Sequence, residues 1–328
     1  MSTLVKAVPE HLLNLNWFEL EEARALSVYE ELSGSLGGIN HKLSPKLVHE
    51  LRVVIRRWYS IWEILELDNW QDKYYEKKIK RPLEKINKHL GGLRDMDVNI
   101  ELAADFQAPS LLIASWRKKR AKLRRKAAQA IQELKPGKID RRLAEHLSRR
   151  AYELERLLIP LPEDQGKKTP SISYPFKSPL EKASYHHIDV FLLDCEAEAK
   201  TMAARELSAE ELHELRLVIK RWRYLLTEFF GVSNIELVRA QQLLGRHHDL
   251  VRLKEALLKY EKKRERKPAR DCKKRELSKE QLAEQKSKLS ECLSRVSLEL
   301  NRVDDEIKRV KQELPYGLRP YRVSPLIG

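Results

Sequence analysis

The sequence predicts an all-α protein made of two helical bundles in tandem. Strong helix formers (Leu, Glu, Lys, Arg and Ala) dominate the chain, whereas Gly supplies only 11 and Pro only 14 of the 328 residues. No segment alternates apolar and polar residues over the length of a strand. A short motif occurs twice at a wide separation, which indicates a repeated half-unit and therefore two bundles.

The helical spacing of apolar residues locates the individual helices. Ser44 and Pro45 are typical of an N-cap followed by a first-turn proline, and Ser208 with Glu211 forms a capping box at the corresponding place in the second half. The predicted helices span residues 18–33, 45–67, 70–89, 94–106, 110–134 and 139–158, and then 180–206, 208–230, 234–246, 248–266 and 275–313.

A proline-rich segment lies between the two groups of helices. Residues 159–179 read IPLPEDQGKKTPSISYPFKSP, and no helical period survives five prolines in so short a stretch. We therefore expect a linker at 159–179 between a first half, 1–158, and a second half, 180–328. Together the halves form a single domain over 1–328.

The repeated motif reads VHELRVVIRRW at 48–58 and LHELRLVIKRW at 212–222. On a helix, each copy gathers its apolar residues on one side and its basic residues on the other, about one turn apart. The apolar stripes are Leu51, Val54, Ile55, Trp58, Trp62 and Leu65 in the first copy, and Leu215, Val218, Ile219, Trp222 and Leu226 in the second. The basic ladders are His49, Arg52 and Arg56, and His213, Arg216, Lys220 and Arg223.

The basic ladders indicate a phosphate-binding face rather than an ordinary solvated one. They occur twice, few carboxylates interrupt them, and a guanidinium offers a planar fork to phosphate oxygens. The formal net charge of +15 likewise indicates a polyanionic partner, whether nucleic acid, anionic membrane or phosphate polymer.

A second echo follows each copy of the motif, LGGLRD at 90–95 and LGRHHD at 244–249. The chain resembles the CHAD family (conserved histidine α-helical domain). The resemblance rests on two motifs that each occur twice in a long basic helical chain: His-x-x-Arg-x-x-x-Lys/Arg-Arg, and after it Leu-Gly-x-x-x-Asp. The resemblance covers nearly the whole chain. The second copy is the closer match, because the first has Tyr59-Ser60 where the second has Arg223-Tyr224.

The resemblance implies two bundles related by pseudo-twofold symmetry, with a basic channel between them that binds inorganic polyphosphate. Members of the family are binding modules without a known reaction, so we expect no enzyme activity. Asp95 and Asp249 would either cap the helix that follows or orient a neighbouring cation such as Arg94 or His248.

The densest positive segment is WRKKRAKLRRK, residues 116–126, with eight cations in eleven positions. Arg117, Arg120 and Arg124 share one helical face there. We expect part of this segment to contact phosphate, the alternative being plain surface charge. The predicted polyphosphate-binding residues are His49, Arg52, Arg56, Arg57, Arg94, Arg120, Arg124, His213, Arg216, Lys220, Arg221, Arg223 and Tyr224.

Other functions fit the sequence less well. RNA binding is the main alternative, although no familiar nucleic-acid module is present and aromatic residues make up only 7% of the chain. Residues 196–200, EAEAK, match the ExExK signature of triphosphate-tunnel enzymes, but that signature needs a strand and this segment has a helical composition. A phosphorylated histidine is disfavoured because no small residue adjoins His49.

The remaining expectations concern cofactors and location. Three cysteines without a CxxC spacing predict neither a disulfide framework nor a zinc site, and we expect no cofactor and no metal. No apolar stretch is long enough to span a membrane and no secretory signal is recognisable. We therefore expect a cytoplasmic protein, and the resemblance to the CHAD family implies a location at polyphosphate granules.

Overall fold

The computed structural model describes residues 17–37, 43–65, 73–157, 179–230, 232–265 and 279–318. Every regular element within these ranges is a helix, so the predicted all-α class is confirmed. No helix in these ranges is long and apolar enough to cross a membrane. The predicted linker lies outside the described residues except for Pro179, which begins a helix.

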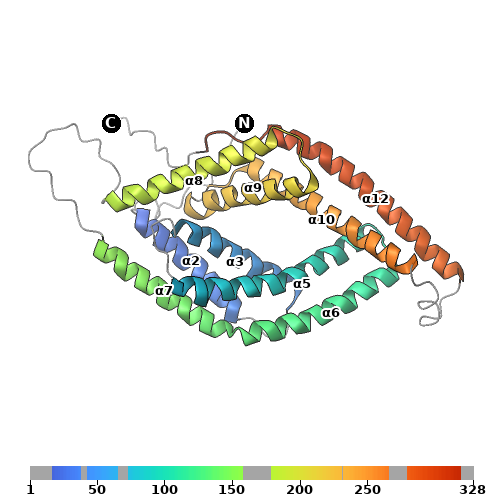
Figure 1. The fold of residues 1–328 in the computed structure, drawn as a ribbon, viewed down its shortest axis with the longest axis horizontal. Helices are drawn as coiled ribbons and strands as arrows, with labels where there is room; N and C mark the ends of the chain where they lie inside the picture. The colour runs from blue at the N-terminus through green and yellow to red at the C-terminus, as the bar shows by residue number, and fades with distance from the viewer. Residues whose placement is uncertain are drawn as a thin grey trace, which may run out of the picture.

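Outside residues 70–106 and 234–266, the helices lie near the predicted segments (Figure 1). The first half contains α2 (Trp17–Gly37), α3 (Pro45–Leu65), the short α4 (Lys73–Tyr75), a π-helical turn η2 (Glu76–Lys80), α5 (Arg81–Asp105), α6 (Ser110–Glu133) and α7 (Pro136–Leu157). The second half contains α8 (Pro179–Ala203), α9 (Ala209–Phe230), α10 (Ile235–Glu265) and α12 (Lys279–Gln312).

Both predicted helix starts are confirmed by their capping bonds. The Ser44 hydroxyl accepts a bond from the backbone N–H of Leu47 at 3.2 Å. At the start of α9, the backbone N–H of Glu211 donates to the Ser208 hydroxyl at 3.3 Å, while the Ser208 N–H donates to the Glu211 carboxylate at 2.8 Å. These bonds satisfy donors that a helix N-terminus otherwise leaves free, and they fix where the two repeated helices begin.

The two apolar stripes form the core. Within the described residues, every stripe position of α3 and α9 with a described side chain is buried, including Trp58 and Trp222 at 0% exposure. The indole N–H of Trp58 donates to the Tyr75 hydroxyl at 2.9 Å, which satisfies its only polar atom in the core. With one side of each repeated helix buried in the core, its opposite, basic side faces the space between the two halves.

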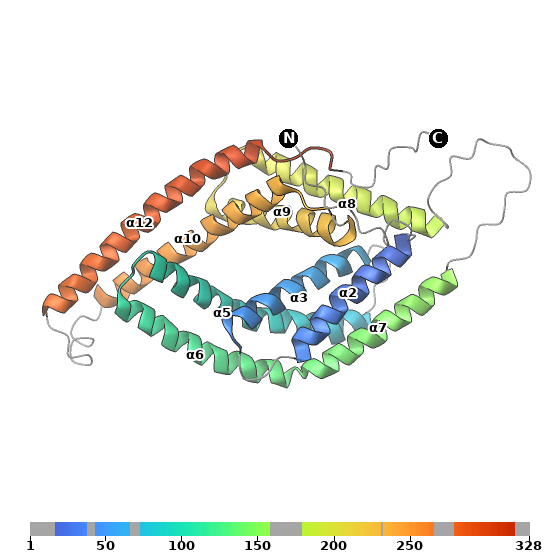
Figure 2. The ribbon, with the colours of Figure 1, turned by 180° about the vertical axis from the view of Figure 1, so that it is seen from behind.

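Four helices surround that centre. Helix α3 contacts α5 and α9, and α10 contacts α5 and α9, so each half contributes two helices. The remaining long helices lie outside them: α2 packs on α3 and α7 on α2, while α6 packs on α5, α8 on α9 and α12 on α10 (Figure 2). The pseudo-twofold relation between the halves stays a prediction.

The predicted breaks around the two Leu-Gly-x-x-x-Asp motifs are wrong. Helix α5 runs through Gly91 without interruption, and α10 runs through Gly245. Glycine lowers helix propensity, but packing against the rest of the bundle overrides that preference. Asp95 and Asp249 consequently lie in helix interiors, and the idea that they cap helices is also wrong.

Candidate functional site

A basic cavity of about 370 Å³ lies between the four central helices. Both halves of the chain line it with cationic and histidine side chains, and among the described residues two carboxylates face it. Its lining consists of His49, Arg52 and Arg56 on α3; Arg94, Asp95, Val98 and Asn99 on α5; His213, Arg216, Leu217 and Lys220 on α9; and His248, Asp249 and Arg252 on α10.

The glycine of each Leu-Gly-x-x-x-Asp motif makes room for an arginine of the repeated helix. A Cβ atom on Gly91 would lie 3.0 Å from Nη1 of Arg52, which donates to the Asn87 carbonyl at 2.6 Å. A Cβ atom on Gly245 would lie 3.3 Å from Nε of Arg216. The two repeated motifs are therefore in contact within each half. The glycine on α5 lies beside the arginine of α3, and the glycine on α10 lies beside the arginine of α9.

Burial and like charges perturb the cations of the cavity. Burial, together with the nearby guanidinium groups of Arg56 and Arg216, lowers the pKa of Lys220 to about 7. Burial also lowers the pKa of Arg56 and that of Arg52, while both remain charged at neutral pH. Nε of Arg216 is buried and has no hydrogen-bond partner within the described structure. The cations of the lining outnumber its two carboxylates, Asp95 and Asp249.

The histidines of the second half stack on each other. The ring centroids of His213 and His248 are 4.3 Å apart and their planes differ by 24°. Burial and the neighbouring His213 lower the pKa of His248 to about 4. Burial also lowers the pKa of His213 and of His49, so all three rings are mainly neutral at pH 7.

Two carboxylates accompany the cations. Asp95 forms an ion pair with Arg252 at 3.1 Å, which joins α5 of the first half to α10 of the second. Burial raises the pKa of Asp249, although Arg216 and Arg94 oppose that rise. The sequence suggested Arg94 or His248 as the cation that an aspartate would orient, whereas the cation paired with Asp95 is Arg252.

The structure brings seven of the predicted binding residues together in the cavity: His49, Arg52, Arg56, Arg94, His213, Arg216 and Lys220. Sequence reasoning did not place Arg252 there, and it named His248 only as a neighbour of Asp249. A signal was present, since positions 248 and 252 lie one helical turn apart on one face of α10. The repeat obscured it, because Val98 occupies the corresponding position in the first half.

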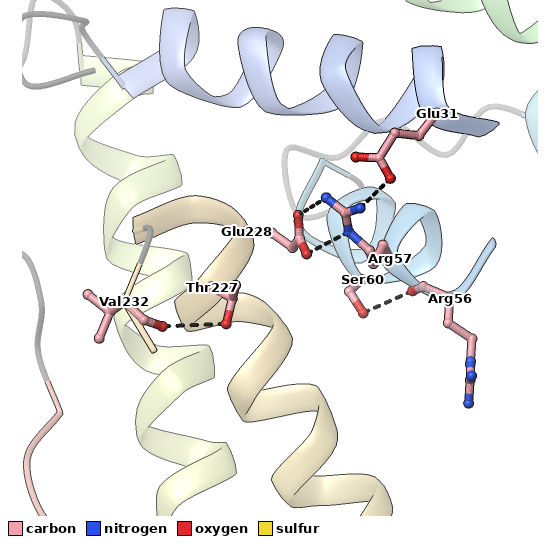
Figure 3. Close-up of polar contacts among 7 residues, drawn as sticks. All are labelled: Glu31, Arg56, Arg57, Ser60, Thr227, Glu228 and Val232. Carbon is pink, nitrogen blue, oxygen red and sulfur yellow. Dashed lines mark hydrogen bonds and ion pairs between the residues drawn. The ribbon is translucent and has the colours of Figure 1, made fainter. Parts of the chain in front are cut away.

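Arg57 does not line the cavity, although it follows Arg56 in the motif. Figure 3 shows its guanidinium held between two carboxylates while the Arg56 side chain points away from them. Nε of Arg57 lies 2.7 Å from the carboxylate of Glu228 on α9, and Nη1 donates to Glu31 on α2. The 100° step between consecutive residues directs Arg57 to the seam of three helices, where it has a structural role.

Five other predicted residues also lie outside the cavity lining. The Arg120 guanidinium is bound to Asp97 at 2.6 Å and to the Leu43 carbonyl at 3.1 Å. The remaining four have separate surroundings: Arg124 is exposed on α6, Arg221 stacks over Phe191 at 3.9 Å, Arg223 donates to Gln241 at 2.8 Å, and Tyr224 is buried beneath Lys220 and Arg223.

The described residues show no group of three or more His, Cys, Asp or Glu side chains that would hold a metal ion. Cys195 and Cys292 are buried free thiols. The ExExK segment lies within α8, where Lys200 and Glu196 form an i, i+4 pair at 3.8 Å, so it cannot present three side chains on one face of a strand. The arrangement of the cavity suits electrostatic binding of an anion that carries several charges.

Comparison with known proteins agrees with this architecture. Residues 30–258 match the family model of the CHAD domain. The fold is similar to the crystal structure of the CHAD domain from the plant Ricinus communis, with a TM-score of 0.60 and 20% identity over 96% of this chain and 97% of that chain. It is also similar to PptA from Streptomyces chartreusis, with a TM-score of 0.55 and 14% identity over 91% of this chain and 100% of that chain. No curated protein matches the chain. Because the family model matches more than half of the residues, the chain belongs to the CHAD domain family.

Proposed function

We propose that the protein binds inorganic polyphosphate, without chemical conversion, in the basic cavity between its two halves. The observation that carries the proposal is the charge of the lining: five arginines and Lys220 face one space of about 370 Å³, and only Asp95 and Asp249 oppose them. Such a concentration of partly desolvated cations is unfavourable in the absence of an anion.

Membership of the CHAD family supports a polyphosphate-related role in general, and CHAD domains are generally binding domains. The cavity adds chemical reasons for the finer assignment. Guanidinium groups bind phosphate oxygens with paired, directional hydrogen bonds, and the cations come from helices of both halves. A linear polyanion can therefore contact both halves at once.

The proposal is tested by removing cavity charges for which the described structure shows no ion pair with a carboxylate. The double variant Arg216→Gln with Lys220→Gln should bind long-chain polyphosphate at least about a hundredfold more weakly, since charge-assisted contacts contribute about 1.5–3 kcal/mol each. Isothermal titration calorimetry gives the dissociation constants. The matched control is Arg302→Gln with Lys308→Gln on α12, which removes two exposed cations and should leave the affinity unchanged. Equal affinity of the double variant and the wild type would contradict the proposal.

Competition distinguishes polyphosphate from RNA. Unlabelled polyphosphate should displace labelled RNA at a far lower phosphate concentration than RNA displaces labelled polyphosphate. The density of charge is the reason, because every phosphate of the inorganic polymer is available without ribose and base between neighbours. Displacement in the reverse order would make RNA the ligand of the cavity.

Polyphosphate binding would also direct the protein to polyphosphate granules in cells. A fluorescent fusion of the full chain should concentrate at granules stained for polyphosphate, and the Arg216→Gln, Lys220→Gln variant should not. The α12 double variant provides the control, since it keeps the cavity intact. If the cavity variant concentrates at granules as strongly as the wild type, the cavity does not direct the protein to them.

A further inference from the structure

Helix α6 carries a second basic surface outside the cavity, which we call the α6 face. It consists of seven exposed side chains: Arg117, Lys118, Lys119, Lys122, Arg124, Arg125 and Lys126. None of the seven has an ion pair or hydrogen bond with another residue of the described structure. Their exposure and their lack of partners leave the face free to bind an anion.

The charge pattern of α6 differs from that of the other long outer helix. On α12, exposed cations alternate with carboxylates, as in the pairs of Arg302 with Glu306 at 3.3 Å and Lys308 with Asp305 at 3.1 Å. Helix α6 has no carboxylate before Glu133. Like charges four residues apart destabilise a helix, so α6 keeps its unpaired cations at the expense of its own stability.

The surroundings of the α6 face favour a phosphate polymer over other polyanionic partners. No large hydrophobic side chain of α6 is strongly exposed, whereas a helix that binds a membrane surface needs apolar side chains to insert. Trp116, the aromatic residue beside the basic run, is partly buried against the core, which limits the ring surface on which an unpaired base would stack.

The position of α6 relates the face to the cavity. Arg120 on α6 is bound to Asp97 on α5 at 2.6 Å, and the neighbouring Val98 lines the cavity. Helix α6 therefore lies on the outer side of the α5 wall (Figures 1 and 2). The α6 face lies on the side of α6 that is turned away from α5, so both helices, each roughly 10–12 Å across, separate it from the cavity.

We propose that the α6 face binds the part of a long polyphosphate chain that extends beyond the cavity, so that one chain occupies both surfaces. This inference rests on the proposed function and adds a preference for long chains. Once one stretch of the polymer is bound in the cavity, the flexible remainder is held near α6 at a high effective concentration, and the second contact raises the affinity. A chain too short to pass around α5 and α6 gains nothing from the face.

The test compares a short and a long probe on the full chain. The triple variant Lys118→Gln, Lys122→Gln, Arg125→Gln removes the centre of the α6 face, and Gln preserves helix propensity. It should bind tripolyphosphate like the wild type but long-chain polyphosphate about tenfold more weakly. Its log–log salt slope for the long chain should be shallower by about 2, at about 0.7 per lost contact. The control Lys288→Gln, Arg302→Gln, Lys308→Gln on α12 loses the same charge and should match the wild type with both probes.

Each contrary result has a distinct meaning. The inference fails if the α6 triple variant keeps its affinity for long-chain polyphosphate, or if its affinities for the short and the long probe fall equally. It also fails if the α12 control loses as much long-chain affinity as the α6 variant. A triple variant that binds labelled RNA more weakly but keeps its affinity for long-chain polyphosphate would also contradict the inference, because the face would then bind nucleic acid. The proposed function fails separately if Arg216→Gln with Lys220→Gln leaves the binding of both polyphosphate probes intact.

Discussion

Consecutive arginines at positions 56 and 57 illustrate how one residue step decides a role. Arg56 projects into the cavity among other cations, whereas Arg57 joins three helices through Glu228 and Glu31. The Arg57 side chain is 23% exposed and that of Glu228 only 7% exposed, so the pair is largely shielded from solvent. The attraction of the two carboxylates correspondingly raises the pKa of Arg57.

Opposite outcomes are therefore expected for the two arginines. Arg57→Gln leaves Glu228 buried without a cation and should lower the free energy of unfolding by roughly 3 kcal/mol, with polyphosphate affinity kept. Arg56→Gln should weaken polyphosphate binding while stability stays near that of the wild type, because it removes a buried like-charge neighbour. Urea denaturation and calorimetry measure the two effects. A stable Arg57→Gln variant that loses binding would reverse the assignment.

Lys220 makes the binding of polyphosphate dependent on pH. Its pKa of about 7 in the free protein means that it is mainly neutral at pH 8 and charged at pH 6. Arg56, Arg216, Arg52 and Arg223 surround it and favour the neutral form. A bound polyanion favours the charged form, so binding takes up a proton and the affinity increases as pH falls through 7.

We expect the affinity for polyphosphate to be about tenfold higher at pH 6 than at pH 8 from Lys220 alone. His49 and His213 should add to the increase at the acid end, since their lowered pKa values place their protonation there. Lys220→Arg, which stays charged, should flatten the profile between pH 7 and 8. Calorimetry in buffers of different ionisation enthalpy measures the proton uptake, and an identical profile for Lys220→Arg would exclude Lys220 as its cause.

At the scale of the element, the glycines of α5 have different tasks although they are adjacent. Gly91 lies beside the Arg52 guanidinium, whereas nothing lies within 4 Å of a Cβ atom on Gly92. Both positions are in the interior of one continuous helix, where alanine is ordinarily the more stable residue by about 1 kcal/mol. Substitutions at Gly91 and Gly92 therefore distinguish the effect of helix propensity, which both positions share, from the effect of crowding Arg52, which only Gly91 has.

Alanine scanning of these glycines gives a matched experiment. Gly92→Ala should raise the free energy of unfolding by up to about 1 kcal/mol and leave polyphosphate binding unchanged. Gly91→Ala should give little or no gain and weaken binding, because its methyl group displaces Arg52 from the Asn87 carbonyl. If Gly91→Ala is as stable and binds as tightly as Gly92→Ala, the close approach of Arg52 is unimportant.

At the scale of the whole molecule, the cavity exists only where the two halves meet. Helices α3 and α5 supply one side and α9 and α10 the other, and the Asp95–Arg252 and Arg57–Glu228 pairs join the halves. A ligand in such a site binds the folded state and not the unfolded chain, so its binding free energy is added to the stability of the fold.

Long-chain polyphosphate at about a hundred times its dissociation constant should therefore raise the free energy of unfolding by about 2.7 kcal/mol. Both halves should unfold in the same transition, as followed by circular dichroism, because the ligand holds them together. The Arg216→Gln, Lys220→Gln variant should show no such shift at the same concentration. Stabilisation of that variant to the full extent would place the bound anion elsewhere.

The sequence by itself determined the helical class, the caps of α3 and α9, the buried stripes and the basic ladders, because each depends on residues within a few turns of one another. Helical periodicity is local, so Trp58 and Trp222 could be assigned to the core and Arg52 and Arg216 to the opposite side without the fold. The two repeated motifs likewise indicated the CHAD family from the residues alone, and membership of that family is confirmed.

Only the tertiary structure decided which cations share a space. Whether Gly91 ends a helix or receives an arginine depends on a neighbour 39 positions earlier in the chain. Arg57 and Arg120 are occupied by carboxylates on other helices, and Arg252 reaches the cavity from a position that the repeat did not highlight. Charge and periodicity specify the face of a helix, but the packing of helices distant in sequence determines what that face meets.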